Sequence, residues 1–204
     1  MKEQILEQLQ EFNQKTKEIL FFNFVLSEDS YSIEINHETF QAKPVEIVGA
    51  LIESGVNANT RAVLQKTLLF EVRTKEVAEL LIQNGADVNA RDFYGETPLF
   101  HVKSKEVAEV LIQAGADVNA KNEDGFTPLF FAISKEIAEL LIQAGADVNI
   151  KNNQNRTPIE FQRQSDDFDL ADFMEQKATK LEQEKLNQNL PQSQKSLNHP
   201  QYRL

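Results

Sequence analysis

The chain has 204 residues, of which 41% are hydrophobic and 26% are charged, a composition that supports a packed core rather than wholesale disorder. It contains no cysteine, which excludes disulfides, thiolate metal sites and cysteine nucleophiles and is typical of a reducing compartment. The formal net charge of −11 disfavours nucleic acid and anionic membranes as partners, because phosphate groups attract clustered lysine and arginine.

The first 36 residues match no other part of the chain and are expected to form a helix followed by a β-hairpin. The apolar residues that share one helix face are Ile5, Leu9, Phe12 and Ile19. Apolar and polar residues then alternate on both sides of residues 27–30, which predicts paired strands at about 22–26 and 31–35. We interpret the segment 1–36 as an N-terminal cap, with a partner-docking element as the alternative.

From about residue 37 the sequence repeats every 30 residues. The residues that recur at this interval are Gly55, Gly85, Gly115 and Gly145; Thr67, Thr97, Thr127 and Thr157; and Phe40, Phe70, Phe100 and Phe130. Such a period predicts a solenoid in which each unit packs mainly against its neighbours. The predicted units are 37–66, 67–96, 97–126 and 127–156, followed by a C-terminal capping unit at 157–175.

Each unit is expected to contain two short helices and an extended loop. In the third unit, Thr97-Pro98 is typical of the start of a short first helix. Ser104 is the predicted N-cap of a second helix that ends before Gly115, and the loop follows at 116–126. The polar stripe of the second helix is predicted to face solvent, and its wide apolar remainder to pack against neighbouring units.

The chain is expected to end in a polar extension. Thr157-Pro158 starts a last first helix, and Ser165, with acidic residues after it, is the predicted N-cap of a last second helix. The remaining segment, 176–204, is predicted to continue this helix and then to become a mobile tail from about Asn187.

The sequences TPLF (97–100) and GADVNA (115–120) resemble the TPLH and GADVNA signatures of the ankyrin repeat. This resemblance implies an all-α repeat solenoid of antiparallel helix pairs with β-turn fingers, which acts as a binding scaffold. The units have 30 residues rather than the usual number of about 33, and phenylalanine replaces the usual histidine. These differences predict a shortened first helix, more apolar packing between units and a shallower groove.

No arrangement of residues predicts catalysis, metal binding or cofactor binding. The three histidines, His37, His101 and His199, are far apart in sequence, and His101 is expected to pack beside the core without convergent partners. The aspartates that recur in the GADVN turns are Asp87, Asp117 and Asp147, and they are expected to be structural. Residues 122–125 lack the ligand pattern of a calcium loop. The sequence therefore predicts a protein that is not an enzyme.

Positions that vary between units are free to contact a partner, and they fall at the finger tips and along the first helices. The predicted partner-binding residues are Val63, Leu64, Phe93, Tyr94, Glu96, His101, Lys103, Asp124, Phe126, Phe131 and Ile133. Phe93, Tyr94 and Phe126 are the leading candidates, because aromatic side chains are enriched in interface hot spots. The alternative is that Phe93 or Phe126 packs onto the neighbouring finger.

The sequence as a whole predicts a cytoplasmic, monomeric interaction module that binds a protein partner. One alternative is a structural protein that self-associates through its terminal segments, and another is an acidic, immunity-type inhibitor of a basic toxin or enzyme. Delivery into another cell is a further alternative that rests on analogy alone.

Overall fold

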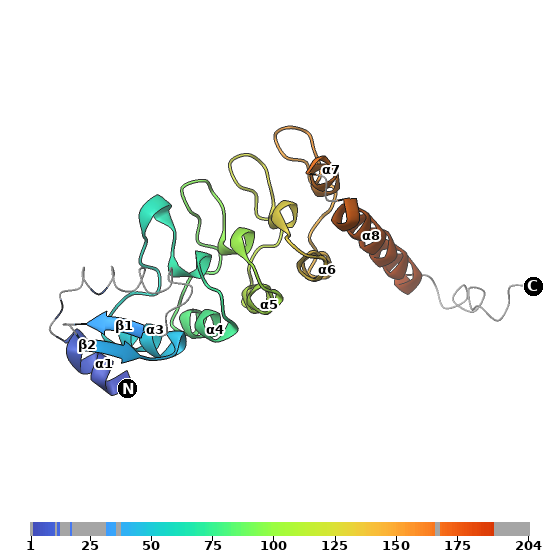
Figure 1. Cartoon of the computed structure of the whole chain (residues 1–204). Helices are drawn as coiled ribbons and strands as arrows, with labels where there is room; N and C mark the ends of the chain where they lie inside the picture. The colour runs from blue at the N-terminus through green and yellow to red at the C-terminus, as the bar shows by residue number, and fades with distance from the viewer. Residues whose placement is uncertain are drawn as a thin grey trace, which may run out of the picture.

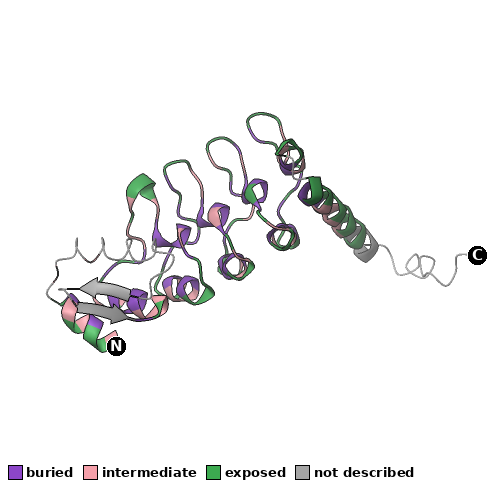
Figure 2. Ribbon diagram, in the orientation of Figure 1, coloured by how far each residue is buried: buried purple, intermediate pink, exposed green. Residues whose placement is uncertain are grey.

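The structure is a computed structural model that describes residues 2–10, 12, 17, 32–35, 38–165 and 168–189. Helices stack side by side along one direction, and a finger-shaped loop projects from successive units on the same side of the stack (Figure 1). Buried residues follow the line along which the units meet, whereas the finger tips and the outer sides of the helices are largely exposed (Figure 2). The predicted repeat solenoid is therefore confirmed.

Helix α1 (Lys2–Leu9) lies against helix α3 (Pro44–Glu53) at the N-terminal end of the stack. Its Ile5 and Leu9 are fully buried there, so the apolar helix face predicted from their spacing is confirmed at these two positions. Ile19 lies outside the described residues.

A two-stranded antiparallel sheet follows helix α1 in the described part of the chain. Strand β1 (Ser32–Ile35) pairs antiparallel with β2 (Glu38–Gln41), so that Ile33 lies opposite Phe40. The predicted strand near 31–35 is confirmed, and its pairing with β2, where Thr39 and Phe40 also favour extended backbone, was not predicted. The other predicted strand, 22–26, lies outside the described residues.

The internal units share one pattern of two short helices. The 3-10 helices are η2 (Leu68–Phe70), η3 (Pro98–His101) and η4 (Pro128–Phe131), and the α-helices that follow them are α4 (Lys75–Gln83), α5 (Lys105–Gln113) and α6 (Lys135–Gln143). A further 3-10 helix, η1 (Val63–Gln65), lies in the first finger. Only seven residues separate the start of η3 from the start of α5, which leaves room for a single 3-10 turn. The predicted shortening of the first helix is confirmed.

The second helices begin and end as predicted. The hydroxyl of Ser104 accepts a hydrogen bond from the N–H of Val107 at 3.3 Å, and Thr74 and Ser134 cap α4 and α6 in the same way. Gly115 follows α5 with a φ of 91°, a conformation that side chains disfavour.

Thr97 stands at the N-cap position of η3, but its side chain does not cap the helix. The N–H of Phe100 donates instead to the backbone carbonyl of Thr97 at 3.0 Å, which is the i to i+3 bond of a 3-10 turn. The buried hydroxyl of Thr97 is therefore left without a hydrogen-bond partner. The single 3-10 turn of η3 therefore forms without a side-chain cap.

The repeated phenylalanines pack between units, as predicted. Phe100 is 6% exposed and Phe130 is fully buried. The ring centroid of Phe100 lies 5.9 Å from that of Phe131, and the centroid of Phe130 lies 5.7 Å from that of Phe161 in the following unit. Aromatic contacts of this kind stabilise the stacking of units.

Polar side chains of the GADVN turns also join neighbouring units. The side-chain oxygen of Asn89 accepts a hydrogen bond from the N–H of Asp117 at 2.8 Å, and its amide group donates to the carbonyl of Gly115 at 3.0 Å. Asn59 and Asn119 make the same two contacts one unit earlier and one unit later. Asp117 accepts the N–H of Asn119 at 2.9 Å and so closes the turn. The repeated aspartates are therefore structural, as predicted.

The last unit has longer helices, α7 (Pro158–Gln164) and α8 (Phe168–Asn189). The start of α7 and the start of α8 are ten residues apart, three more than in the internal units, and this extra length permits a true α-helix. Ser165 is the C-cap of α7 rather than the predicted N-cap of α8, and its hydroxyl donates to the carbonyl of Phe161 at 3.2 Å. No helix in the described part of the chain is long and apolar enough to cross a membrane.

Candidate functional site

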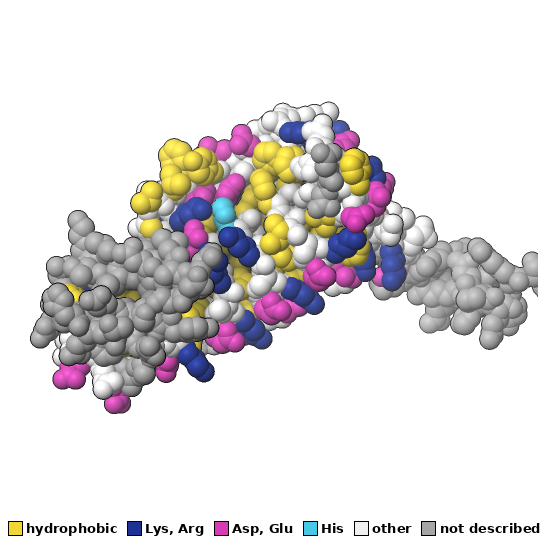
Figure 3. Space-filling view, viewed as in Figure 1, with side chains coloured by type: hydrophobic (Ala, Val, Ile, Leu, Met, Phe, Trp, Pro, Cys, Tyr) yellow, Lys and Arg dark blue, Asp and Glu magenta, His cyan; other side chains and the backbone are white. Residues whose placement is uncertain are grey.

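Two adjacent fingers expose a group of large apolar side chains. The exposed fractions are 83% for Val63, 44% for Leu64, 63% for Phe93 and 50% for Tyr94. The N–H of Phe93 donates to the carbonyl of Leu64 at 2.8 Å, which fixes the two fingers side by side. Hydrophobic side chains gather over these fingers in the space-filling view (Figure 3). We call these four residues the finger patch.

The backbone of the first finger is strained where it presents this patch. Leu64 has a φ of 58° and Gln65 a φ of 63°, whereas Gly95 occupies the position equivalent to Gln65 in the next finger. The left-handed region costs a residue with a side chain about 1–2 kcal/mol. The position of Gln65 has a positive φ in each later finger as well, including Asn155 at 62°, so Leu64 is the residue at which the first finger departs from the repeat.

The other predicted partner-binding residues differ in exposure. Ile133 is 63% exposed and Phe131 is 36% exposed, and both Lys103 and Asp124 are exposed. Lys103 lies between η3 and α5, and Ile133 occupies the equivalent position between η4 and α6 in the next unit. They lie outside the finger patch, so they extend the exposed set along the array.

Phe126 is partly buried and packs against other aromatic side chains of the protein. Its ring centroid lies 5.0 Å from that of Phe130, 5.4 Å from that of Phe131 and 5.4 Å from that of Phe161. The guanidinium of Arg156 lies 5.4 Å from the Phe161 centroid and covers one side of this cluster. The structure thus places Phe126 among packing residues, on the first helices rather than on the neighbouring finger.

The residue before each repeated threonine contacts the residue five positions later. The four pairs are Lys66 with Glu71 (3.7 Å from Nζ to Oε1), Glu96 with His101 (2.9 Å from Oε2 to Nε2), Phe126 with Phe131 (5.4 Å between ring centroids) and Arg156 with Phe161 (5.4 Å from the guanidinium to the ring centroid). The residue types vary between units, but the contact between the two positions is present in each of these units. Their variation therefore reflects internal packing as well as freedom to bind a partner.

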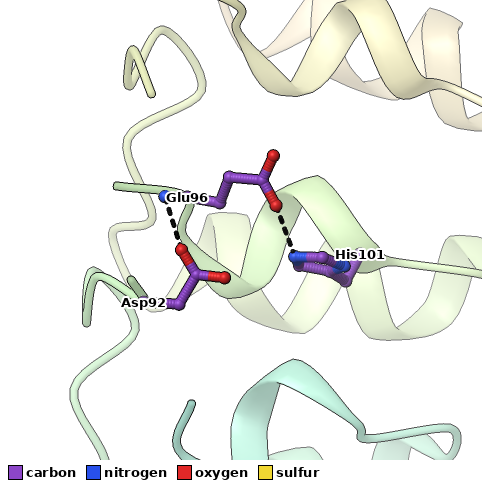
Figure 4. Close-up of side chains that lie close together, drawn as sticks. All are labelled: Asp92, Glu96 and His101. Atoms are coloured by element: carbon purple, nitrogen blue, oxygen red, sulfur yellow. Dashed lines mark hydrogen bonds and ion pairs between the residues drawn. The ribbon is translucent and has the colours of Figure 1, made fainter. Parts of the chain in front are cut away.

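Asp92 joins Glu96 and His101 to form a cluster that the sequence did not predict (Figure 4). One ligand atom from each side chain lies within 4.8 Å of the others. Asp92 is 7% exposed, and its Oδ1 accepts hydrogen bonds from the N–H groups of Tyr94 and Glu96 at 2.9 and 3.0 Å. Its Oδ2 is buried without a hydrogen-bond partner. The prediction that His101 lacks convergent partners was therefore wrong.

The surroundings of His101 favour the neutral form of its imidazole. Burial lowers the pKa of His101 below its ordinary value, and Lys66 lowers it further, whereas Glu96, Asp92 and Glu71 raise it. The Nε2 of His101 lies 2.9 Å from Oε2 of Glu96, yet the two groups do not have the geometry of a hydrogen bond. The imidazole of His101 and the carboxylate of Glu96 therefore lie in contact without a hydrogen bond between them.

The acidic stripe of the second helices carries its own counter-charges. Lys75 pairs with Glu79 at 3.5 Å, and Lys105 pairs with Glu109 at 3.3 Å, one turn along each helix. These side chains are substantially exposed, so each pair contributes little stability. The outer helix face is a solvated surface, as predicted.

A family model described as ankyrin repeats in three copies matches residues 37–122 and 68–152. No curated protein matches the chain. The matched residues cover more than half of the sequence and coincide with the stacked helix pairs and their fingers. The chain therefore belongs to the ankyrin-repeat family.

Proposed function

We propose that this chain is an interaction module that binds a protein partner through the finger patch. Ankyrin repeats generally mediate protein–protein interaction and are typically not enzymes. The observation that carries the proposal is the exposure of Val63, Leu64, Phe93 and Tyr94 on two adjacent fingers. A contiguous apolar surface of this kind marks an interaction site on a soluble protein.

The residue types in the finger patch suit a binding surface. Phenylalanine and tyrosine offer large contact areas and lose little conformational entropy on binding, and aromatic residues are enriched in interface hot spots. The rings of Phe93 and Tyr94 already meet edge to face, with centroids 5.4 Å apart, so their mutual arrangement is set before a partner binds. A partner surface with apolar side chains would complement this patch.

The proposal is tested by comparing two double variants of the full chain as baits in an extract of the native cell. One variant carries Phe93→Ala and Tyr94→Ala. The control carries Glu123→Ala and Gln154→Ala, which change the equivalent tip positions of later fingers. The expected result is a partner that the wild type and the control capture but the patch variant does not. The proposal is supported when this partner, once purified, also binds the wild type and the control more tightly than the patch variant. A purified partner that binds all three proteins equally contradicts the patch assignment.

Light scattering separates partner binding from self-association. A chain that binds a different protein through the patch is expected to be monomeric at every concentration. A wild-type dimer that the patch variant converts to a monomer would show that the patch instead joins two copies of this chain.

A further inference from the structure

We propose that Asp92, Glu96 and His101 bind one divalent transition-metal ion, for which Zn²⁺ is the probe. The three residues come from the two arms of one finger and from the end of η3, next to the finger patch (Figure 4). This site is independent of the proposed function, because binding of the ion requires no protein partner.

Asp92 has a carboxylate that the repeat scaffold does not need. Asn122 and Asn152 occupy the equivalent positions in the next two fingers, and each uses its side-chain oxygen to accept the same two backbone N–H groups. An asparagine would therefore satisfy the turn at residue 92 equally well. Aspartate adds a second, negatively charged oxygen, which is buried and makes no hydrogen bond.

A bound cation would satisfy the three polar groups together. Buried charged and polar groups without partners cost free energy, and buried charges are normally paired or coordinate metal ions. Here Oδ2 of Asp92 and Nε2 of His101 are both buried without a hydrogen-bond partner, and a Glu96 oxygen lies 2.9 Å from that nitrogen. Lys66, the nearby cation that lowers the pKa of His101, pairs with Glu71.

The ligand set favours a transition metal over Mg²⁺ or Ca²⁺, because these two ions prefer oxygen ligands alone. Zinc binds imidazole nitrogen and carboxylate oxygen at about 2.0–2.2 Å, which places tetrahedral ligands about 3.3 Å apart. One pair of ligand atoms is 2.9 Å apart and all three lie within 4.8 Å of one another, so small side-chain rotations would complete the site. Water would occupy the fourth position.

The neighbouring groups hold the ligands in place. The two N–H groups on Oδ1 fix the carboxylate of Asp92, and the amide of Asn122 donates to Oε1 of Glu96 at 3.2 Å. Outer contacts of this kind orient ligands and increase metal affinity. In the other described units the three equivalent positions hold Ala62, Lys66 and Glu71; Asn122, Phe126 and Phe131; or Asn152, Arg156 and Phe161, and none of these sets offers three ligands.

The test is calorimetric titration of the full chain, freed of metal with EDTA, by ZnCl₂. The wild type is expected to bind one Zn²⁺, and Asp92→Asn and His101→Phe to weaken binding by at least about 100-fold, more than the loss of an outer contact. Both substitutions introduce residues that the equivalent positions already hold, so the fold is expected to persist, as circular dichroism would verify. Asn122→Ala is expected to weaken binding about tenfold.

A His37→Ala, His199→Ala variant controls for the other two histidines and is expected to keep the site. The proposal is wrong if the wild type binds no Zn²⁺ at millimolar concentration, or if Asp92→Asn and His101→Phe both bind as tightly as the wild type. Loss of binding in the histidine control would also overturn it, and Mg²⁺ binding as tight as that of Zn²⁺ would refute the choice of metal.

Discussion

Replacing Phe126 by alanine is expected to destabilise the fold rather than to remove a contact with a partner. Phe126 has three aromatic neighbours at centroid distances of 5.0–5.4 Å, and it is edge to face with Phe130 and Phe161. Burial of a phenylalanine side chain contributes about 1.5–3 kcal/mol, and each favourable aromatic pair adds about 0.5–1.5 kcal/mol. Because Phe126 is only partly buried, we expect a loss of about 2–3 kcal/mol.

Urea denaturation followed by circular dichroism measures this loss directly, and thermal denaturation should show a melting temperature lower by roughly 4–12 °C. Phe93→Ala is the matched control, because Phe93 is 63% exposed and its loss should change the free energy of unfolding by less than about 0.5 kcal/mol. If Phe126→Ala were as stable as Phe93→Ala but bound the partner more weakly, Phe126 would belong to the binding surface and our interpretation of the cluster would be refuted.

The remaining predictions concern the finger patch, the helix caps and His101. Phe93→Ala and Tyr94→Ala together should weaken binding of the purified partner by about 30-fold or more, measured by titration calorimetry, since a hot-spot residue contributes about 2 kcal/mol; an unchanged affinity would contradict this. Ser104→Ala should lower the free energy of unfolding by about 1 kcal/mol because it removes the cap of α5. By contrast, Thr97→Val should not destabilise the protein in the same urea assay, because the Thr97 hydroxyl is buried without a partner; equal losses in the two variants would refute the distinction. Burial and the charge of Lys66 lower the pKa of His101 in the folded state, against the opposing effect of Glu96, Asp92 and Glu71. The unfolded chain therefore binds the proton more readily than the folded chain. The neutral imidazole thus contributes stability above a pH of about 6.5, and this stability is lost as the pH falls further. Urea denaturation in EDTA at pH 7.5 and 5.5 should therefore show that the free energy of unfolding decreases more with acid for the wild type than for His101→Phe. Equal decreases in the two proteins would contradict the predicted direction of the pKa shift.

The repeat fold could be predicted from the sequence because its determinants are local and are copied from unit to unit. The cap at Ser104, the break at Gly115 and the seven-residue step from Pro98 to Lys105 each act within one unit. The pairing of β1 with β2 could not be predicted in the same way. Alternating residues show that a strand is favoured, but they do not specify which of several extended segments becomes its partner.

Part of the candidate site could also have been found in the sequence. Variation between units predicts residues that are free to contact a partner, and Phe93 and Tyr94 have the exposure that this prediction requires. Variation alone does not show that two positions five residues apart are in contact, as Phe126 and Phe131 are. The exposure of a side chain, in contrast, depends on how neighbouring units stack, which no single unit specifies.

The same comparison between units separates the Glu96–His101 pair from the others. A lysine beside a carboxylate, two facing aromatic rings, and an arginine over a ring each attract without a third group. The Glu96 carboxylate and the His101 imidazole lie 2.9 Å apart without a hydrogen bond between them, and a cation between them would bind both. This unit also has Asp92, whose extra oxygen the turn does not require. Two departures from the repeat pattern therefore meet at one point, and a bound cation accounts for both.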